Sequence, residues 1–397
     1  MEAIMASNED AISLLFKGLK LDIKNNSHIP DSKKQKLYKN FQIKEKLARE
    51  KCQEGLSEED AIEFVFENVF DDTTLDQTRI ESIMKEYINS LENISEINSA
   101  WFASMIIICL KEVNKDNNNS CIIRCKEWLL SHKIDDCKWD SKKYSPGIPN
   151  IYDTSFAVVA LLRAGITSDS EIIKSAIRYI KTSMHPYKAW SPTIKDDIDV
   201  GSTSWAIIAL REANEPNDSK YIIGPANWLI NYGQHQDGGW GCKWKKDIEV
   251  NSSITRTYDA VNALLIAGFD PESNIIKNAM EFLIEQQGLV MKKKVGCFAW
   301  PEEFISCGII MNCLENTSCA EILLLDFIKS QGDKAIINDV LYDIDSPIVK
   351  AGISWIIDYI EEKEFHKIRY FVPRMLICLN KYCKLKSNEI SGLPGIN

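Results

Sequence analysis

The sequence predicts an all-α protein, an (α/α)6 toroid of repeated helix pairs with a helical N-terminal extension. A phrase of small and apolar residues recurs with a period of about 50 residues, and its clearest copies contain Thr154, Thr203 and Thr257. Apolar helices lie between these copies at the same period. No alternation of apolar and polar residues typical of β-strands competes with the helical pattern in this region.

The composition is that of a globular protein without a nucleic-acid partner. Of the 397 residues, 45% are hydrophobic and 26% are charged, and the formal net charge of −10 opposes binding to phosphate backbones. The 12 cysteines are scattered without zinc-ligand spacing, so we expect buried thiols and no bound metal. No signal peptide or membrane-spanning run is recognisable, which favours a cytoplasmic location and leaves peripheral membrane contact open.

Residues 1–94 are predicted to form the helical extension. A helix begins near Ser57, where a capping residue precedes three acidic residues. Apolar side chains then follow at helical spacing: Ile62, Val65, Phe66 and Val69. No motif in this segment indicates chemistry, so we divide the chain into an extension, 1–94, and a barrel, 95–397.

The inner ring of the barrel is predicted from six copies of one phrase. The three clearest copies run over 153–161, 202–210 and 256–264, and weaker copies begin near Ala103, Cys307 and Ala351. Such alanine-rich helices pack closely and tolerate burial on most sides. The sixth helix has two candidates, because the period favours 346–359 whereas 369–383 fits a closing helix equally well.

The outer ring is predicted from a second series of helices. Each precedes the next copy of the inner phrase and carries an aromatic residue: Trp128, Tyr179, Trp228, Phe282 and Phe327. Two interleaved series at one period indicate a helix-pair repeat.

One turn between helices has a distinctive sequence. Residues 234–241, Gln-His-Gln-Asp-Gly-Gly-Trp-Gly, follow one apolar helix and precede another. The two adjacent glycines permit a sharp reversal, and the Gln, Asp and Trp side chains can stabilise it.

These features together resemble the terpenoid cyclase and protein prenyltransferase superfamily, especially squalene–hopene cyclases. Residues 234–241 resemble the glutamine–tryptophan (QW) repeat of that superfamily, the Thr-Ser-x-Ala helices resemble its helices, and the phrase at 371–376 resembles its final helix. The resemblance covers about residues 95–385 and implies a helical barrel whose apolar cavity holds an isoprenoid.

The resemblance also implies a catalytic acid in an Asp-x-Asp-Asp motif at the start of an inner helix. Two strings match this motif in part. In the first, Asp197 and Asp199 match two acids and Val200 falls on the last. In the second, Asp153 matches the last acid, and Asn150 and Tyr152 replace the earlier ones, including the acid that the family uses as proton donor. Asp197, Asp199 and Asp153 are therefore the predicted catalytic residues.

The predicted acids gather on the rim where the inner helices begin. Arg256 occupies the repeat position of Asp153 and should share that rim, together with Glu302 and Glu303. A diphosphate or carboxylate could dock at these helix N-termini, helped by Lys243, Lys245 and Lys246. The alternatives are that Arg256 pairs with Asp153 or Glu303, and that Asp197 and Asp199 form a solvated acidic loop.

Aromatic residues complete the predicted site. Phe156 and Trp205 share one repeat position on inner helices, Tyr258 lies one place earlier, and Trp240 lies in the distinctive turn. Trp205 and Tyr258 are favoured for the cavity wall because each also carries a polar group. With Arg256, these residues form the predicted substrate-binding set.

The sequence thus predicts an enzyme that cyclises an isoprenoid, a polyprenyl diphosphate or a polyene, by protonation. No cofactor is expected, except Mg²⁺ if the substrate is a diphosphate. One alternative is a catalytically silent toroid that binds a protein or a lipid. Another is a prenyltransferase-like enzyme, which would need a zinc site that the sequence does not supply.

Overall fold

The computed structural model describes residues 75–391 apart from 136–137, 141–145, 243–251, 294–308, 339 and 362–364. Before residue 75 it describes only residues 12, 17, 20, 24, 42, 45–46, 48–58 and 61. The predicted helices at Ile62–Val69 and the turn lysines Lys243, Lys245 and Lys246 lie outside the described residues, as do Glu302 and Glu303.

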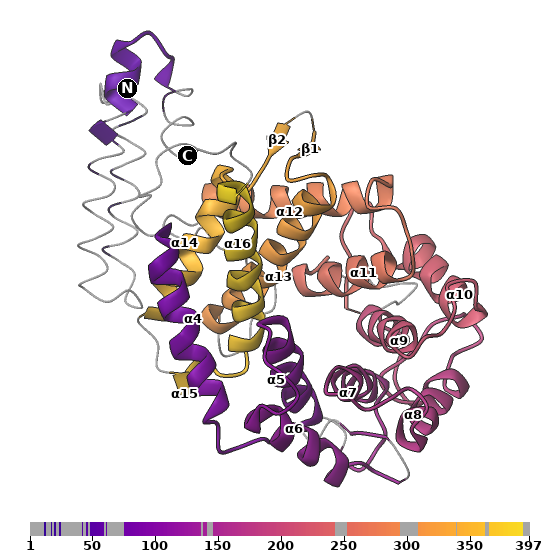
Figure 1. Cartoon of the computed structure of the whole chain (residues 1–397). Coiled ribbons are helices and arrows are strands. Elements are labelled where there is room, and N and C mark those ends of the chain that lie inside the picture. Colours follow the sequence, from indigo (N-terminus) through magenta and orange to yellow (C-terminus); the bar gives the residue numbers. More distant parts are fainter. Residues whose placement is uncertain are drawn as a thin grey trace, which may run out of the picture.

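Within the described residues, six helices form a closed inner ring (Figure 1). Each helix packs against the next in chain order, and the last packs against the first. In that order they are α5 (Ala100–Glu112), α7 (Ile151–Arg163), α9 (Val200–Glu212), α11 (Ile254–Ile266), α13 (Ile309–Ser330) and α16 (Val372–Ser391). The predicted toroid is therefore confirmed.

The inner position of these helices follows from their composition. In α9 every residue from Val200 to Leu210 is buried, and most are small or apolar. An outer helix such as α8 (Glu171–Thr182) buries one stripe only, formed by Ile173, Ala176 and Ile180, and exposes its charged residues. The two burial patterns separate the layers because a helix covered on all sides cannot carry a polar face.

In the outer layer, each inner helix is covered by at least one helix (Figure 1). Helix α6 (Ser120–Ser131) packs on α5, α8 on α7, and α10 (Lys220–Trp228) with the π-helix η2 (Leu229–Gly233) on α9. Helix α12 (Asn274–Lys293) packs on α11, and α14 (Pro347–Glu361) on α13. Helix α4 (Gln77–Glu92) covers α16, although it precedes residue 95.

The last repeat differs from the prediction. Helix α14 occupies the candidate range 346–359 and lies in the outer layer, whereas α16 at 369–383 is the sixth inner helix. Ala351 therefore does not start an inner copy, and Phe327 belongs to the inner helix α13 rather than to the outer series. A short hairpin of β1 (Ala335–Ile337) and β2 (Val340–Tyr342), and the short helix α15 (Phe365–Ile368), lengthen this part of the chain.

Three buried tryptophans join the outer helices to the inner ones. Each follows an outer helix, donates its indole N–H to a carbonyl of that helix and its backbone N–H to a threonine hydroxyl of the next inner helix. The pairs are Trp139 with Leu129 and Thr154, Trp190 with Ile180 and Thr203, and Trp240 with Leu229 and Thr257. The recurring threonine of the repeat is thus a hydrogen-bond acceptor for the turn before it.

The Gln234–Gly241 turn adds a link to the following helix. The Gln234 side-chain amide donates to the carbonyls of Gly238 and Ile275, the latter in α12. Gly238 has a φ of 86°, and a Cβ there would lie 2.2 Å from the Asn278 carbonyl oxygen. Glycine is therefore required at this position both for the backbone conformation and for the close approach of α12.

Candidate functional site

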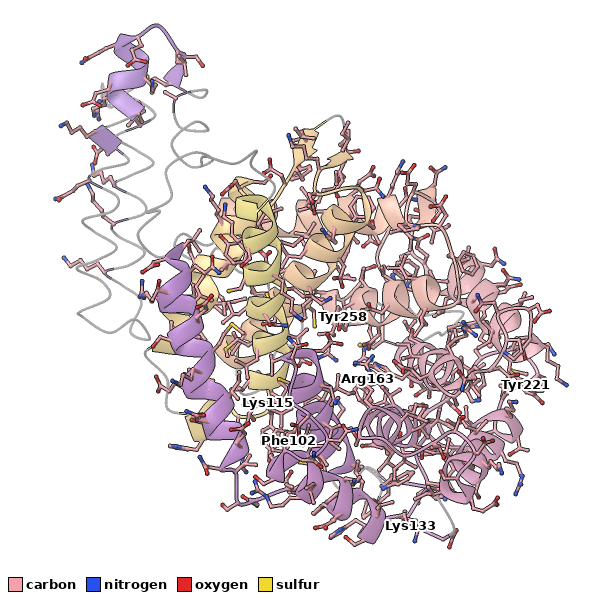
Figure 2. All side chains as sticks on the ribbon, viewed as in Figure 1. Phe102, Lys115, Lys133, Arg163, Tyr221 and Tyr258 are labelled. Atoms are coloured by element: carbon pink, nitrogen blue, oxygen red, sulfur yellow. The ribbon has the colours of Figure 1, made fainter. Side chains whose placement is uncertain are left out.

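A cavity of about 250 Å³ lies inside the inner ring, and all six inner helices contribute to its wall. Ligand pockets commonly enclose about 300–1,000 Å³, so this cavity is small for the class. Its lining residues are Ile108, Glu112, Val159, Arg163, Trp205, Ile208, Tyr258, Asp259, Asn262, Leu265, Ile266, Ile322, Asp326, Ile377 and Lys381. Figure 2 shows Arg163 and Tyr258 near the middle of the ring.

The cavity wall changes from apolar to charged along the helices. On four inner helices an Ile or Val that lines the cavity is followed four residues later by a charged residue. Residues four apart lie on one helix face, one turn along the axis. The apolar residues therefore form a belt, and the charged ones form a mouth one turn nearer the C-terminal ends of the helices: Ile108 and Glu112, Val159 and Arg163, Ile322 and Asp326, Ile377 and Lys381.

The charges at the mouth are paired across neighbouring helices. The Arg163 guanidinium lies 3.0 Å from a Glu112 carboxylate oxygen and 2.7 Å from one of Glu212, which joins α7 to both of its neighbours. The Lys381 amine lies 2.5 Å from an Asp326 carboxylate oxygen, which joins α16 to α13.

Asp259 forms the other end of the cavity and is fully buried on α11. One of its carboxylate oxygens accepts a hydrogen bond of 2.9 Å from the Trp205 indole, and the other accepts one of 2.7 Å from Arg256. Arg374 on α16 lies 3.9 Å from Asp259. Sequence reasoning missed Asp259, although it occupies the repeat position of Phe156 and Trp205 and is the only acid among the three.

Arg374 ties this end of the cavity to α13. Its guanidinium lies 3.3 Å from a Glu315 carboxylate oxygen and donates to the Cys319 sulfur at 2.8 Å. It also lies over the Tyr258 ring, 4.8 Å from the centroid. Two arginines and two carboxylates thus share this buried end, so that the charges balance.

Arg256 reaches Asp259 through a gap that a glycine provides. A Cβ on Gly201 would lie 2.0 Å from an Arg256 guanidinium nitrogen and 3.2 Å from the Tyr152 ring. The guanidinium also lies over the Tyr152 ring, 5.5 Å from its centroid. Among the described residues Arg256 therefore pairs with Asp259 and not with Asp153, while Glu303, the other partner that the sequence alternatives named, lies outside them.

Aromatic side chains fill the N-terminal half of the ring. Phe156 and Trp205 stack with centroids 3.5 Å apart, and Tyr152 contacts both rings at 4.9 and 6.4 Å. Trp101 lies edge-on to Phe156 at 6.5 Å. Of the predicted wall residues, Trp205 and Tyr258 line the cavity, and Phe156 lies behind Trp205.

One family model of known proteins matches part of the chain. Residues 153–308 match the family model of the squalene–hopene cyclase C-terminal domain. The chain resembles the terpenoid cyclase and protein prenyltransferase superfamily, as the sequence predicts. No curated protein sequence matches the chain.

The fold is similar to that of solved structures of a type II terpene cyclase, at low sequence identity. The type II terpene cyclase MstE from Scytonema, in complex with merosterolic acid A, matches with a TM-score of 0.52 at 13% identity, over 78% of this chain and 98% of that chain. Its complex with geranylgeranyl dihydroxybenzoate matches with a TM-score of 0.50 at 13% identity, over 78% and 99%. Candida albicans protein geranylgeranyltransferase-I, complexed with GGPP, gives 0.44 at 14% identity, over 77% and 98%.

The structure locates the three positions of the cyclase-type motif on α7. Asn150 caps the helix, with its side chain accepting a hydrogen bond of 3.2 Å from the Asp153 backbone N–H. Tyr152, at the position of the family's proton donor, belongs to the aromatic cluster. Asp153 is 6% exposed, and burial raises the pKa of its carboxyl from 3.8 to about 7, against a hydrogen bond from the Trp101 backbone that lowers it.

The other candidate acids are separated from each other by the structure. Asp199 caps α9 and accepts hydrogen bonds from the Ser202 backbone N–H at 2.6 Å and hydroxyl at 3.0 Å. Burial raises the pKa of Asp199 to about 6 despite these bonds. Asp197 is exposed to solvent in the loop before α9. The alternative of a solvated acidic loop therefore holds for Asp197 and not for Asp199.

Trp240 lies away from the cavity. It is fully buried in the turn before α11, where its hydrogen bonds join η2 to α11. In the part of the chain that the structure describes, no three His, Cys, Asp or Glu side chains gather at metal-binding distances. No described helix is both long and apolar enough to cross a membrane.

Proposed function

We propose that this protein is a terpenoid cyclase-like enzyme that holds an isoprenoid in its central cavity and cyclises it after protonation. The observation that carries the proposal is the cavity itself, because an apolar belt from six helices ends at aromatic side chains and a buried acid. A type II terpene cyclase with the same fold has been seen with a geranylgeranyl substrate, which supports an isoprenoid here.

The closed end of the cavity suits a carbocation. Trp205 and Tyr258 line it, and aromatic rings attract positive charge, most strongly when water is excluded. The Asp259 carboxylate lies beside them and can stabilise the same charge. Arg256 then acts by holding Asp259, and Phe156 by supporting the Trp205 ring.

Asp153 is the proton donor in this proposal. With a pKa of about 7, a large share of its carboxyl groups carries a proton at neutral pH. Its O–H would add the proton to a terminal double bond, leaving a carboxylate and a carbocation, and loss of a proton at the end of the reaction restores the acid. A substrate must pass the Phe156–Trp205 stack to reach it, because Asp153 lies one helical turn before Phe156.

Product analysis by mass spectrometry tests the proposal. The purified protein is incubated with squalene and with polyprenyl diphosphates, with and without Mg²⁺ for the latter. We expect Asp153→Asn to lower turnover at least about 100-fold, in line with the usual contribution of a general acid. Asp197→Asn, an exposed acid nearby, should leave turnover unchanged. Full activity in Asp153→Asn with loss in Asp199→Asn would move the donor to Asp199.

A catalytically silent toroid is the second candidate. The observation in its favour is that Tyr152 occupies the family's donor position and the stacked rings of Phe156 and Trp205 close the path from the cavity. Binding of an isoprenoid in equilibrium dialysis, without product from any chain length, would support this candidate over the enzyme.

A further inference from the structure

The hydrogen-bonding groups of the cavity wall fall into two kinds. The charged groups are satisfied within the protein: Arg163 with Glu112 and Glu212, Lys381 with Asp326, and Asp259 with Arg256. The Trp205 indole N–H is also used, since it donates to Asp259. Among the described residues, two lining side chains keep a polar group with no protein partner, and both are on α11.

The first of these groups is the Tyr258 hydroxyl. The Tyr258 ring is held between α11 and the Arg374 guanidinium, which lies 4.8 Å from its centroid. Burial raises the pKa of its hydroxyl above the ordinary value, so Tyr258 stays a neutral phenol that can donate and accept. Its hydroxyl makes no hydrogen bond to any described residue, and the side chain lines the cavity.

The second group is the Asn262 amide oxygen, one helical turn along the same face. The Asn262 amide nitrogen donates to the Tyr258 backbone carbonyl at 2.9 Å, which fixes the amide orientation. The oxygen is then left as an acceptor without a partner among the described residues, in a side chain that lines the cavity. Side chains four residues apart lie on one helix face, so Tyr258 and Asn262 contribute to the same side of the cavity wall.

We infer that Tyr258 and Asn262 form a subsite for a hydroxyl group on the isoprenoid ligand. A hydroxyl matches the pair because it accepts a hydrogen bond from the phenol and donates one to the amide oxygen. The surrounding belt residues, such as Leu265 and Ile322, would contact the hydrocarbon part of the ligand. This inference rests on the proposed function, since it assumes that the cavity holds an isoprenoid, and it adds that the isoprenoid carries an alcohol or phenol.

The test is equilibrium dialysis of the full-length protein against two probes, with the ligand quantified by gas chromatography. The probes are geraniol and 2,6-dimethyl-2,6-octadiene, which has the same carbon skeleton and double bonds without the hydroxyl. We expect geraniol to bind at least about tenfold more tightly, because a buried polar pair left unpaired disfavours the hydrocarbon.

Variants separate a binding role from a structural one. Tyr258→Phe and Asn262→Leu should each reduce the preference for geraniol about threefold to tenfold, with hydrocarbon affinity changed less than about twofold. Tyr232→Phe, on an exposed tyrosine of the outer layer, is the matched control and should bind as the wild type does.

Each other outcome overturns a defined statement. Equal binding of the two probes to the wild type, or equal weakening of both in the variants, overturns the hydroxyl subsite while the cavity remains an isoprenoid site. Absence of binding by either probe removes the subsite, and the turnover assay with squalene and polyprenyl diphosphates then decides the proposed function separately. A preference for geraniol without cyclised product in the turnover assay confirms the subsite and contradicts the enzyme.

Discussion

Asp153 is a buried acid whose ionisation opposes folding. Its pKa is raised from 3.8 to about 7 by burial, so the protonated form is favoured in the folded chain. A group with a raised folded pKa contributes stability below its unfolded pKa and loses that contribution as the pH rises through the folded pKa. The contribution of Asp153 to the free energy of unfolding is therefore lost between about pH 4 and pH 7.

This shift predicts a pH dependence that Asp153→Asn removes. Between pH 5 and pH 8 the wild type should lose on the order of 2 to 3 kcal/mol of unfolding free energy relative to the variant, since each pKa unit is worth about 1.4 kcal/mol. Guanidinium unfolding at the two pH values measures it, with Asp197→Asn as an exposed control. Parallel pH profiles of wild type and Asp153→Asn would show that burial does not shift this carboxyl.

Gly201→Ala should change the free energy of unfolding in opposite directions in the wild type and in an Arg256→Met variant. In the wild type, Gly201→Ala puts a Cβ 2.0 Å from the Arg256 guanidinium and forces it off Asp259, at a cost of about 1–3 kcal/mol. In an Arg256→Met background the clash with the guanidinium is gone and the Tyr152 ring, 3.2 Å from the Cβ, needs to shift by only a few tenths of an ångström, so alanine should stabilise the helix by about 0.5–1 kcal/mol. Urea unfolding of the wild type, the two single variants and the double variant gives the coupling free energy between positions 201 and 256. If Gly201→Ala stabilises the wild type, the close contact between Gly201 and Arg256 is contradicted.

At this scale the sequence predicted some site residues and not others. Trp205 and Tyr258 could be placed at the cavity because the repeat aligns them on inner helices. Asp259 could have been found in the same way, as an acid where two sister helices carry aromatic residues. The positions of Asp197 and Asp199 could not be predicted from the sequence, because they depend on the loop conformation. In the structure Asp197 is exposed to solvent and Asp199 is the N-terminal cap of α9.

Among the elements, the buried tryptophan and the threonine of the next inner helix form the recurring joint. Trp190 donates its backbone N–H to the Thr203 hydroxyl at 3.0 Å and its indole N–H to the Ile180 carbonyl at 2.7 Å. Thr203→Val keeps the shape and removes the acceptor, so a buried N–H loses its partner. We expect a loss of about 1–3 kcal/mol in denaturant unfolding. Thr203→Ser retains the hydroxyl, and a serine variant no more stable than the valine one would rule out the hydrogen bond as the cause.

The helices also show where a repeat period misleads. The first inner copies follow one another evenly, and so their helices were predictable from spacing. After α13, which runs for 22 residues, the chain adds the hairpin, α14 and α15 before the next inner helix begins at Val372. An extrapolated period therefore falls on α14, whose apolar composition resembles that of an inner helix although it lies in the outer layer, on α13.

For the whole molecule, the two ends of the described chain close the ring. Helix α16 packs between α13 and α5, and α4 covers α16 from outside. The Tyr87 hydroxyl of α4 donates to the Ile360 carbonyl of α14 at 2.8 Å, and the Cys121 thiol of α6 donates to the Leu91 carbonyl of α4. Helix α4 thus belongs to the outer layer, which composition alone did not indicate because its segment is as polar as the residues before it.

Two truncations test whether the barrel begins at α4 or at residue 95. A chain that starts at residue 75 keeps the buried face of α4, formed by Ile80, Ile83, Met84, Tyr87 and Leu91. It should unfold in one cooperative transition, as a closed ring does. A chain that starts at residue 95 uncovers α16 and lacks the partner of the Cys121 thiol, so we expect aggregation or a markedly lower midpoint in thermal unfolding followed by circular dichroism. If the shorter chain is monomeric and melts at the same temperature, α4 is an accessory to a ring that closes without it.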